Sequence, residues 1–257
     1  MMFPRVSPLH LSLLVAASAA LMTPAHAQKA AQDGGRVGLA AIGAYEYLGS
    51  DETRNLVLPV VEYEWASGWF AGINGVGRQW TTGDLQYGAK LTYDFGREES
   101  RSTALRGLGN VDPSAELGGF VRYALGGGVA AKTGVRVGAG VDNKGALWDL
   151  GLEFSRPLGT DWRLGGGLTA TYATSDYLQS YFGVTPKQAL ASGYAVYSPS
   201  AGLRDVTAKV SLTYLFTPRV ALTGVVSHTS LMGDAKDAPM VRRTSAATGL
   251  VALTYAF

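Results

Sequence analysis

Histidine and serine are the side chains that most readily form a nucleophilic site, and the sequence brings them together near residue 228. His228 follows Ser227 directly, and Ser230 lies close behind, so a Ser–His hydrolase is the first activity to consider. If this segment is a strand, however, His228 shares one face with Leu222 and Val226, because side chains alternate between the two faces of a strand. An imidazole on such an apolar face is an interfacial residue, and we predict no catalytic role for it.

Metal and phosphate sites have little support. The chain contains no cysteine and three histidines, which leaves scattered carboxylates as the main metal ligands. No spacing singles out a pair of carboxylates for acid–base catalysis. Two glycine triplets, 126–128 and 165–167, lack the following helix that a phosphate-binding loop requires. The sequence therefore predicts no metal, no cofactor and no catalytic residue.

The remaining reactive side chains are charges that recur at alternate positions of apolar segments. The acidic ones are Glu46, Glu62, Glu64, Asp94, Glu116, Asp149, Glu153 and Asp205, and the basic ones are Arg36, Arg78, Lys90, Arg122, Lys132, Arg136, Arg163 and Lys209. From this set we take as candidate lumen residues Lys90, Asp94, Arg122, Arg136, Asp149, Glu153, Arg163, Asp205 and Lys209.

These charges have two interpretations if they line the inside of a barrel. The first is a narrow polar channel, and the second is a set of ion pairs that fills a small barrel. Small barrels are commonly filled by side chains, whereas open aqueous pores belong to larger ones. The two signs balance, so neither interpretation predicts a strongly ion-selective pore, which would show a ring of one sign.

Strands must position these charges, because apolar residues alternate with polar ones along most of the chain. In the segment 203–216, for example, Val206, Val210 and Tyr214 fall on one face, while Asp205 and Lys209 fall on the other. This periodicity of two is typical of strands with one polar and one apolar face. It predicts about eleven strands, at 36–47, 55–65, 69–80, 85–96, 116–125, 128–141, 146–155, 162–174, 203–216, 220–229 and 244–257.

Three features favour a transmembrane barrel over a soluble sandwich. The strands have the length of about ten residues that a tilted membrane strand needs. Aromatic residues such as Trp65, Tyr93 and Trp162 lie near the ends of the apolar stripes, as in interfacial girdles. The last strand ends on Phe257, as the assembly signal of bacterial outer-membrane proteins does. We therefore predict a single antiparallel up-and-down barrel that crosses the bacterial outer membrane and contacts its lipid and lipopolysaccharide.

The number of strands follows from the connections. The long connections 97–115, 175–202 and 230–243 would lie outside the cell, and short turns such as 82–84 and 217–219 would face the periplasm, which is the usual asymmetry. Eleven strands would leave the N-terminus on the wrong side, and bacterial barrels usually have an even number. We predict twelve strands, with ten as the alternative.

Residues 1–27 have the pattern of a cleaved signal peptide. Arg5 supplies the positive charge, residues 11–22 form the apolar segment, and the small residues Ala25 and Ala27 precede a predicted cleavage before Gln28, as secretory leaders require. The barrel then occupies residues 28–257. The formal net charge is only +2, without the basic face of a nucleic-acid-binding protein.

The connection 175–202 is the most distinctive loop. It carries Tyr177, Tyr181 and Phe182 and is too apolar for a solvated loop. We expect it either to fold over the barrel mouth as a lid or to present a surface to a partner.

Six segments of the chain resemble the MipA/OmpV family of outer-membrane proteins, also called the MltA-interacting protein family. The resemblance rests on residues 47–54 (YLGSDETR), 58–63 (LPVVEY), 106–112 (RGLGNVD), 181–189 (YFGVTPKQA), 201–206 (AGLRDV) and 233–241 (GDAKDAPMV). Asn110 and Ala238 depart from the residues expected there, and His228 stands where an aromatic residue is more common. These departures concern local contacts and leave membership unaffected.

The resemblance implies a non-enzymatic scaffold. The protein for which the family is named is similar to a scaffold that joins a periplasmic lytic transglycosylase to a murein synthase, so those two enzymes are the implied partners. Other members resemble adhesion or uptake proteins, which would act through their outer loops. A small-solute channel or receptor, or an adhesin, is therefore the alternative function.

Overall fold

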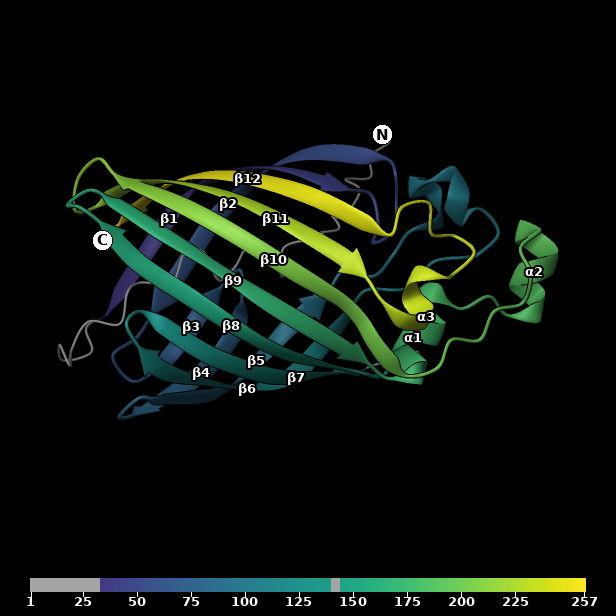
Figure 1. Cartoon of the computed structure of the whole chain (residues 1–257), viewed down its shortest axis with the longest axis horizontal. Helices are drawn as coiled ribbons and strands as arrows, with labels where there is room; N and C mark the ends of the chain where they lie inside the picture. The colour runs from purple at the N-terminus through teal and green to yellow at the C-terminus, as the bar shows by residue number, and fades with distance from the viewer. Residues whose placement is uncertain (1–32, 140–143) are drawn as a thin grey trace, which may run out of the picture.

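The computed structural model describes residues 33–139 and 144–257. These residues form one closed antiparallel barrel, in which each strand pairs with its neighbours in the chain and the first strand pairs with the last (Figure 1). The strands are β1 (Gly34–Tyr45), β2 (Thr53–Glu64), β3 (Trp69–Gly72), β4 (Gly75–Thr82), β5 (Leu85–Asp94), β6 (Ser114–Gly126), β7 (Val129–Ala139), β8 (Ala146–Leu158), β9 (Trp162–Ala173), β10 (Gly202–Leu215), β11 (Val220–Leu231) and β12 (Ser245–Ala256). The predicted twelve-stranded up-and-down barrel is confirmed.

The two ends of the barrel differ. Gly35 and Phe257 exchange backbone hydrogen bonds of 3.1 and 3.0 Å, which join the start of β1 to the end of β12. The short connections 65–68, 83–84, 127–128, 159–161 and 216–219 lie at this same end, which we call the turn end. The long connections and the helices of the described residues lie at the opposite end, the loop end (Figure 1).

Alternation fixes which side chains face outward. The exposed large residues include Leu39 on β1, Leu150 on β8 and Val210 on β10, while their sequence neighbours point into the barrel. Aromatic residues are exposed near the strand ends, as expected for interfacial girdles, and at the turn end Trp162 and Tyr214 pack with ring centroids 4.7 Å apart. None of the helices in the described part of the chain is long and apolar enough to span a membrane.

One predicted strand is wrong. Residues 69–80 form two strands, β3 and β4, joined by a two-residue turn at Ile73 and Asn74. Asn-Gly at 74–75 is a strong hairpin signal, because the following glycine supplies the positive φ that such a turn needs, and Gly75 has φ +102°. This turn supplies the twelfth strand. It also reverses the faces of the second half, so Arg78 lies outside, 5.8 Å from the centre of the Trp69 ring, rather than in the lumen.

The inner wall is only partly polar, whereas the sequence interpretation placed polar faces inward throughout. On β1, β2, β11 and β12 the inward side chains form an apolar cluster made of Ala40, Ile42, Ala44, Leu58, Val60, Val225, Leu250 and Ala252, with Leu56 and Ile73 packed against it. We call this the apolar wall. The strands β5 to β10 carry most of the inward charges.

Helices cover the loop end. They are α1 (Ser175–Phe182), α2 (Pro186–Ser192) and α3 (Gly233–Lys236), together with the short 3-10 helices η3 (Glu99–Arg101) and η4 (Thr103–Leu105). In Figure 1, α1 and α3 lie close to the strand ends, and α2 stands further from the barrel. The predicted signal peptide, residues 1–27, lies outside the described residues.

Candidate functional site

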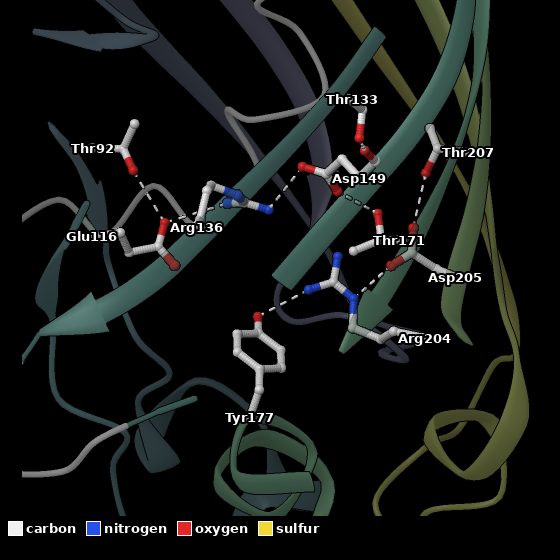
Figure 2. Close-up of polar contacts among 10 residues, drawn as sticks. All are labelled: Thr92, Glu116, Thr133, Arg136, Asp149, Thr171, Tyr177, Arg204, Asp205 and Thr207. Atoms are coloured by element: carbon white, nitrogen blue, oxygen red, sulfur yellow. Dashed lines mark hydrogen bonds and ion pairs between the residues drawn. The ribbon is translucent and has the colours of Figure 1, made fainter. Parts of the chain in front are cut away.

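The charged part of the lumen is organised around Arg136 of β7. Its guanidinium lies 3.3 Å from a carboxylate oxygen of Glu116 on β6 and 3.5 Å from one of Asp149 on β8. The pairing of β6, β7 and β8 brings these inward positions together. Thr92 donates a hydrogen bond to Glu116, and Thr171 donates one to Asp149 (Figure 2). One cation therefore links two carboxylates across three strands.

A second group of charges lies nearer the turn end. Arg122 of β6 contacts Glu153 of β8 at 2.6 Å, and Lys132 of β7, the strand between them, approaches the other oxygen of Glu153 at 3.8 Å. Arg36 of β1 pairs with Glu62 of β2 at 3.2 Å. All of these pairs join neighbouring or next-neighbouring strands, so they reinforce the wall as well as fill the lumen.

Arg204 and Asp205 tie the barrel to α1. They are consecutive residues, yet both point inward, because the register of β10 against β9 shifts between Leu203 and Asp205 and such a bulge turns an extra side chain to the same face. The guanidinium lies 2.5 Å from the Asp205 carboxylate and donates a hydrogen bond of 3.0 Å to the Tyr177 hydroxyl (Figure 2). Arg204 also lies 5.3 Å from the centre of the Tyr177 ring, within cation–π range.

Tyr181 makes the second connection between α1 and the strands. Its hydroxyl donates a hydrogen bond to the Asp94 carboxylate at the end of β5. Arg97 donates to the Tyr181 carbonyl at 2.6 Å, and Lys144 lies 4.0 Å from Asp94. The rings of Tyr177 and Tyr181 stack with centroids 4.6 Å apart, so the two contacts form one unit.

Burial keeps both phenols of this unit protonated. It raises the pKa of the Tyr177 hydroxyl to about 12, although Arg204 opposes the change. Burial also raises the pKa of Tyr181, and the negative charges of an ionised Tyr177 and of Asp94 act in the same direction. A protonated phenol can donate a hydrogen bond to a carboxylate, so Tyr181 holds Asp94 across the whole physiological pH range.

An apolar core closes the loop end above these charges. We call the connections 46–52, 95–113, 174–201 and 232–244 the cap. Its buried residues are Tyr47, Ala104, Leu105, Leu108, Leu178, Phe182, Val184, Ala235, Ala238 and Met240, which pack with Leu147, Ala173 and Leu231 of the strands. The Tyr47 hydroxyl donates a hydrogen bond of 2.7 Å to the Met240 carbonyl, 193 positions away in the chain. Within 175–202, Leu178, Phe182 and Val184 are buried in this core, whereas Leu190 is 90% exposed, so the lid and the partner surface both stay predictions.

The distinctive sequence of the segment 181–189 is explained by the way it starts the helix α2. Thr185 is the N-cap of α2, Pro186 follows at the first helical position, and Thr185 and Gln188 form a capping box, a pairing that satisfies otherwise free backbone N–H groups. Gln188 also donates a hydrogen bond of 2.5 Å to the Leu108 carbonyl. These residues therefore build the cap rather than a catalytic site.

The structure brings most candidate lumen residues together and leaves three apart. Asp94, Arg122, Arg136, Asp149, Glu153 and Asp205 are members of the contacts above. Lys90, Arg163 and Lys209 lie at inward positions of their strands, and in the described part of the chain none of them has a carboxylate within 4 Å. The ring of Phe120 lies 6.0 Å from the Lys90 ammonium.

Sequence analysis missed Arg97, Lys144 and Arg204. Arg97 and Lys144 lie in connections, where alternation gives no face. The signal for Arg204 was available, because two adjacent charges at the start of a strand indicate either a bulge or one outward charge.

The histidine beside Ser227 and Ser230 lies on the outside of the barrel. His228 is exposed on the outer face of β11 beside Val226, where its alternation placed it. Within residues 33–139 and 144–257, no three His, Cys, Asp or Glu side chains gather in a way that could hold a metal ion.

Comparison with known proteins identifies the family. The family described as "MltA-interacting protein MipA" matches residues 37–257. The chain belongs to the MipA family. A protein of Escherichia coli (strain K12) named MltA-interacting protein is 26% identical to it, covering 97% of this chain and 98% of that protein. The protein of the same name from Shigella flexneri shows the same identity and coverage.

Comparison with solved structures finds outer-membrane proteins of low overall similarity to this MipA-family barrel. The COG4313 outer membrane channel from Pseudomonas putida F1 has a TM-score of 0.45 at 11% identity, covering 90% of this chain and 97% of that one. A bacterial polysaccharide outer membrane secretin has a TM-score of 0.43 at 8% identity, covering 90% and 99%. Family and architecture together make this chain an outer-membrane β-barrel.

Proposed function

We propose that this barrel is a non-enzymatic scaffold of the cell envelope, which holds a murein-degrading lytic transglycosylase and, through it, a murein synthase at the outer membrane. The observation that carries the proposal is the match to two proteins named for an interaction with MltA, which extends over 97% of this chain. The geometry is compatible with this role, because the inward carboxylates Glu62, Glu116, Asp149 and Glu153 are paired with inward cations and the cap packs over one end.

The turn end is the surface that such periplasmic partners would contact. Short turns and the end of the last strand lie there, and in bacterial barrels short turns face the periplasm. Charged side chains at the tips of these turns, among them Asp84, Asp161 and Arg219, are exposed and are available to a partner. The loop end would face the cell exterior.

The test measures binding of a purified soluble lytic transglycosylase to the refolded barrel in lipid nanodiscs. Asp84→Lys with Asp161→Lys reverses two negative charges at the turn end, and Asp176→Lys with Asp237→Lys makes the same change at exposed positions of the loop end as the matched control. We expect the turn-end variant to bind several-fold more weakly and the loop-end variant to bind normally. An absence of binding to the unaltered barrel, or a loss confined to the loop-end variant, contradicts the proposal.

A small-solute channel is the second candidate. It is favoured by the inward Lys90, Arg163 and Lys209, which have no close carboxylate in the described part of the chain, and by a cap that is held to the strands through α1. Planar-bilayer conductance separates the two functions. Steady openings of the intact barrel support the channel. Openings that require deletion of 175–200 identify an occluding cap, and silence in both proteins leaves the scaffold.

A further inference from the structure

The wall of the barrel is interrupted beside β2. Strand β2 has twelve residues, but only Tyr63 and Glu64 pair with β3, opposite Ala71 and Phe70. The hairpin β3–β4 turns back at Ile73 and Asn74, so its turn reaches only the level of Glu62. Beyond that level, residues 53–61 of β2 have no neighbouring strand on this side among the described residues. We call this interruption the ladder break.

Backbone polar groups face into the ladder break. Gly35 exchanges both hydrogen bonds with Phe257 of β12, so the odd-numbered residues of β1 point their backbone groups toward β12. Because the direction alternates along an antiparallel strand, the even-numbered residues of β1 bond to the even-numbered residues of β2. The odd-numbered residues of β2, among them Asn55, Val57 and Pro59, therefore direct their backbone groups away from β1. Pro59 has no N–H to leave unpaired, and proline is confined to such strand edges.

The part of the ladder break beside Val57, Pro59 and Val61 lies at the level of the membrane hydrocarbon. These side chains are apolar and face outward, with Val57 68% and Val61 59% exposed, whereas Thr53 and Asn55, nearer the loop end, are polar. At the level of β3 and β4, strands β2 and β5 are three strand spacings apart, about 14 Å. Irregular or unpaired backbone at membrane depth is tolerated only where protein or a water-containing lumen supplies partners. The backbone carbonyl and N–H groups of β2 that have no strand partner among the described residues therefore need a polar partner that can reach them.

The apolar wall begins directly behind the ladder break. Leu58 and Val60, the inward residues of the same β2 segment, belong to it and are buried. Ile73 at the tip of the β3–β4 turn packs against this wall from the side of the break. An aliphatic side chain thus already occupies the position where a hydrocarbon chain from outside would lie.

We propose that the ladder break is a lateral binding site for an acyl chain of a lipid of the surrounding bilayer. The hydrocarbon chain would lie against Leu58, Val60 and their neighbours, in place of Ile73. The ester or amide groups of the lipid would form hydrogen bonds with the free edge of β2 near Asn55, toward the loop end. The apolar side chains on both faces of β2 suit the hydrocarbon chain of a lipid, and the polar backbone edge between them suits its ester or amide group. The bilayer supplies such lipids at high local concentration.

Single-cysteine labelling tests this site, because the chain has no native cysteine. Leu58→Cys places an environment-sensitive fluorophore on the apolar wall, and Val57→Cys places it on the outer face. Ser211→Cys places it inside the lumen on β10, which β1, β12 and β11 separate from β2. Each protein is refolded into vesicles of phospholipid with or without spin-labelled acyl chains, and folding is checked by heat-modifiable migration.

We expect spin-labelled acyl chains to quench most of the emission of the Leu58→Cys label. The Val57→Cys label on the outer face should be quenched as a positive control, and the Ser211→Cys label in the lumen should not be quenched. An unquenched Leu58→Cys label overturns the proposal, and so does equal quenching at Ser211→Cys, because lipid would then fill the lumen without a specific site. If Leu58→Cys does not fold, Val60→Cys reports on the same wall. Ile73→Gly should increase quenching at Leu58→Cys, because it removes the side chain that competes with the lipid.

Discussion

Replacing Arg136 with methionine should destabilise the barrel strongly. The substitution keeps a side chain of similar length and removes the positive charge that faces Glu116 at 3.3 Å and Asp149 at 3.5 Å. The Glu116 side chain is only 7% exposed and that of Asp149 is 28% exposed. Both carboxylates would remain in the lumen without this cation, and water could readily reach only that of Asp149.

The size of the loss follows from this burial. Removing one partner of a buried ion pair costs about 3–5 kcal/mol. The lower value, about 3 kcal/mol, applies here, because Asp149 is partly exposed and each carboxylate keeps a threonine donor. A change of about 3 kcal/mol corresponds to a factor of more than about 100 in the folding equilibrium.

Urea unfolding of the barrel in lipid vesicles, followed by tryptophan fluorescence, measures this loss. We expect a lower midpoint with an unchanged slope, since the slope reports the surface exposed on unfolding. The control combines Glu116→Gln, Arg136→Met and Asp149→Asn. It leaves no unpaired charge and should recover most of the lost stability. The reasoning is refuted if Arg136→Met unfolds at the wild-type midpoint, or if the neutral triple variant is as unstable as the single one.

Three further predictions concern the cap and the β3–β4 turn. Thr185→Ala should cost about 1 kcal/mol of α2 stability and speed amide exchange in that helix, whereas Thr185→Ser should restore slow exchange. Burial raises the pKa of Tyr177 to about 12 and also raises that of Tyr181. The protonated hydroxyls therefore stabilise the cap fully below the unfolded pKa of about 10, and this stabilisation is lost as the pH rises through about 12. Tyrosinate absorbance and protease cleavage of the cap should rise together in that window, and cleavage that is constant up to this pH would contradict the assignment. Gly75→Ala should impair refolding, because Gly75 has φ +102° and an added Cβ would lie 2.2 Å from the Leu91 carbonyl oxygen. Gly224→Ala is the control, because no atom lies within 4 Å of its added Cβ. Heat-modifiable migration measures refolding, and this control should refold like the parent protein.

Alternation was sufficient to predict most of the barrel from the sequence. Segments such as 203–216, in which Val210 faces outward and Asp205 and Lys209 face inward, are strongly periodic because lipid contacts one face and the lumen the other. The same rule located the long connections. It could not show the hairpin at Ile73 and Asn74, because a two-residue turn barely interrupts the periodicity, and only the Asn-Gly pair reveals it.

The candidate site was less accessible to prediction than the wall. Alternation indicates which charges face inward, but only the register between strands shows that Arg136 lies between Glu116 and Asp149. The apolar wall escaped prediction because β1 is apolar on both faces, as Leu39 and Ala40 illustrate. The cap depends on contacts between distant connections, which no local pattern can specify.

The pairing of β1 with β12, which the hydrogen bonds between Gly35 and Phe257 extend, also has a consequence for the order of assembly. The first strand cannot be paired on both sides until the last strand arrives, so a partly exported chain always carries two open edges, at β1 and at its newest strand. Unpaired edges are templates for aggregation, so we expect the chain to need protection from association until β12 pairs with β1. A truncation of only the last few residues would therefore arrest assembly altogether, rather than yield a slightly weaker barrel.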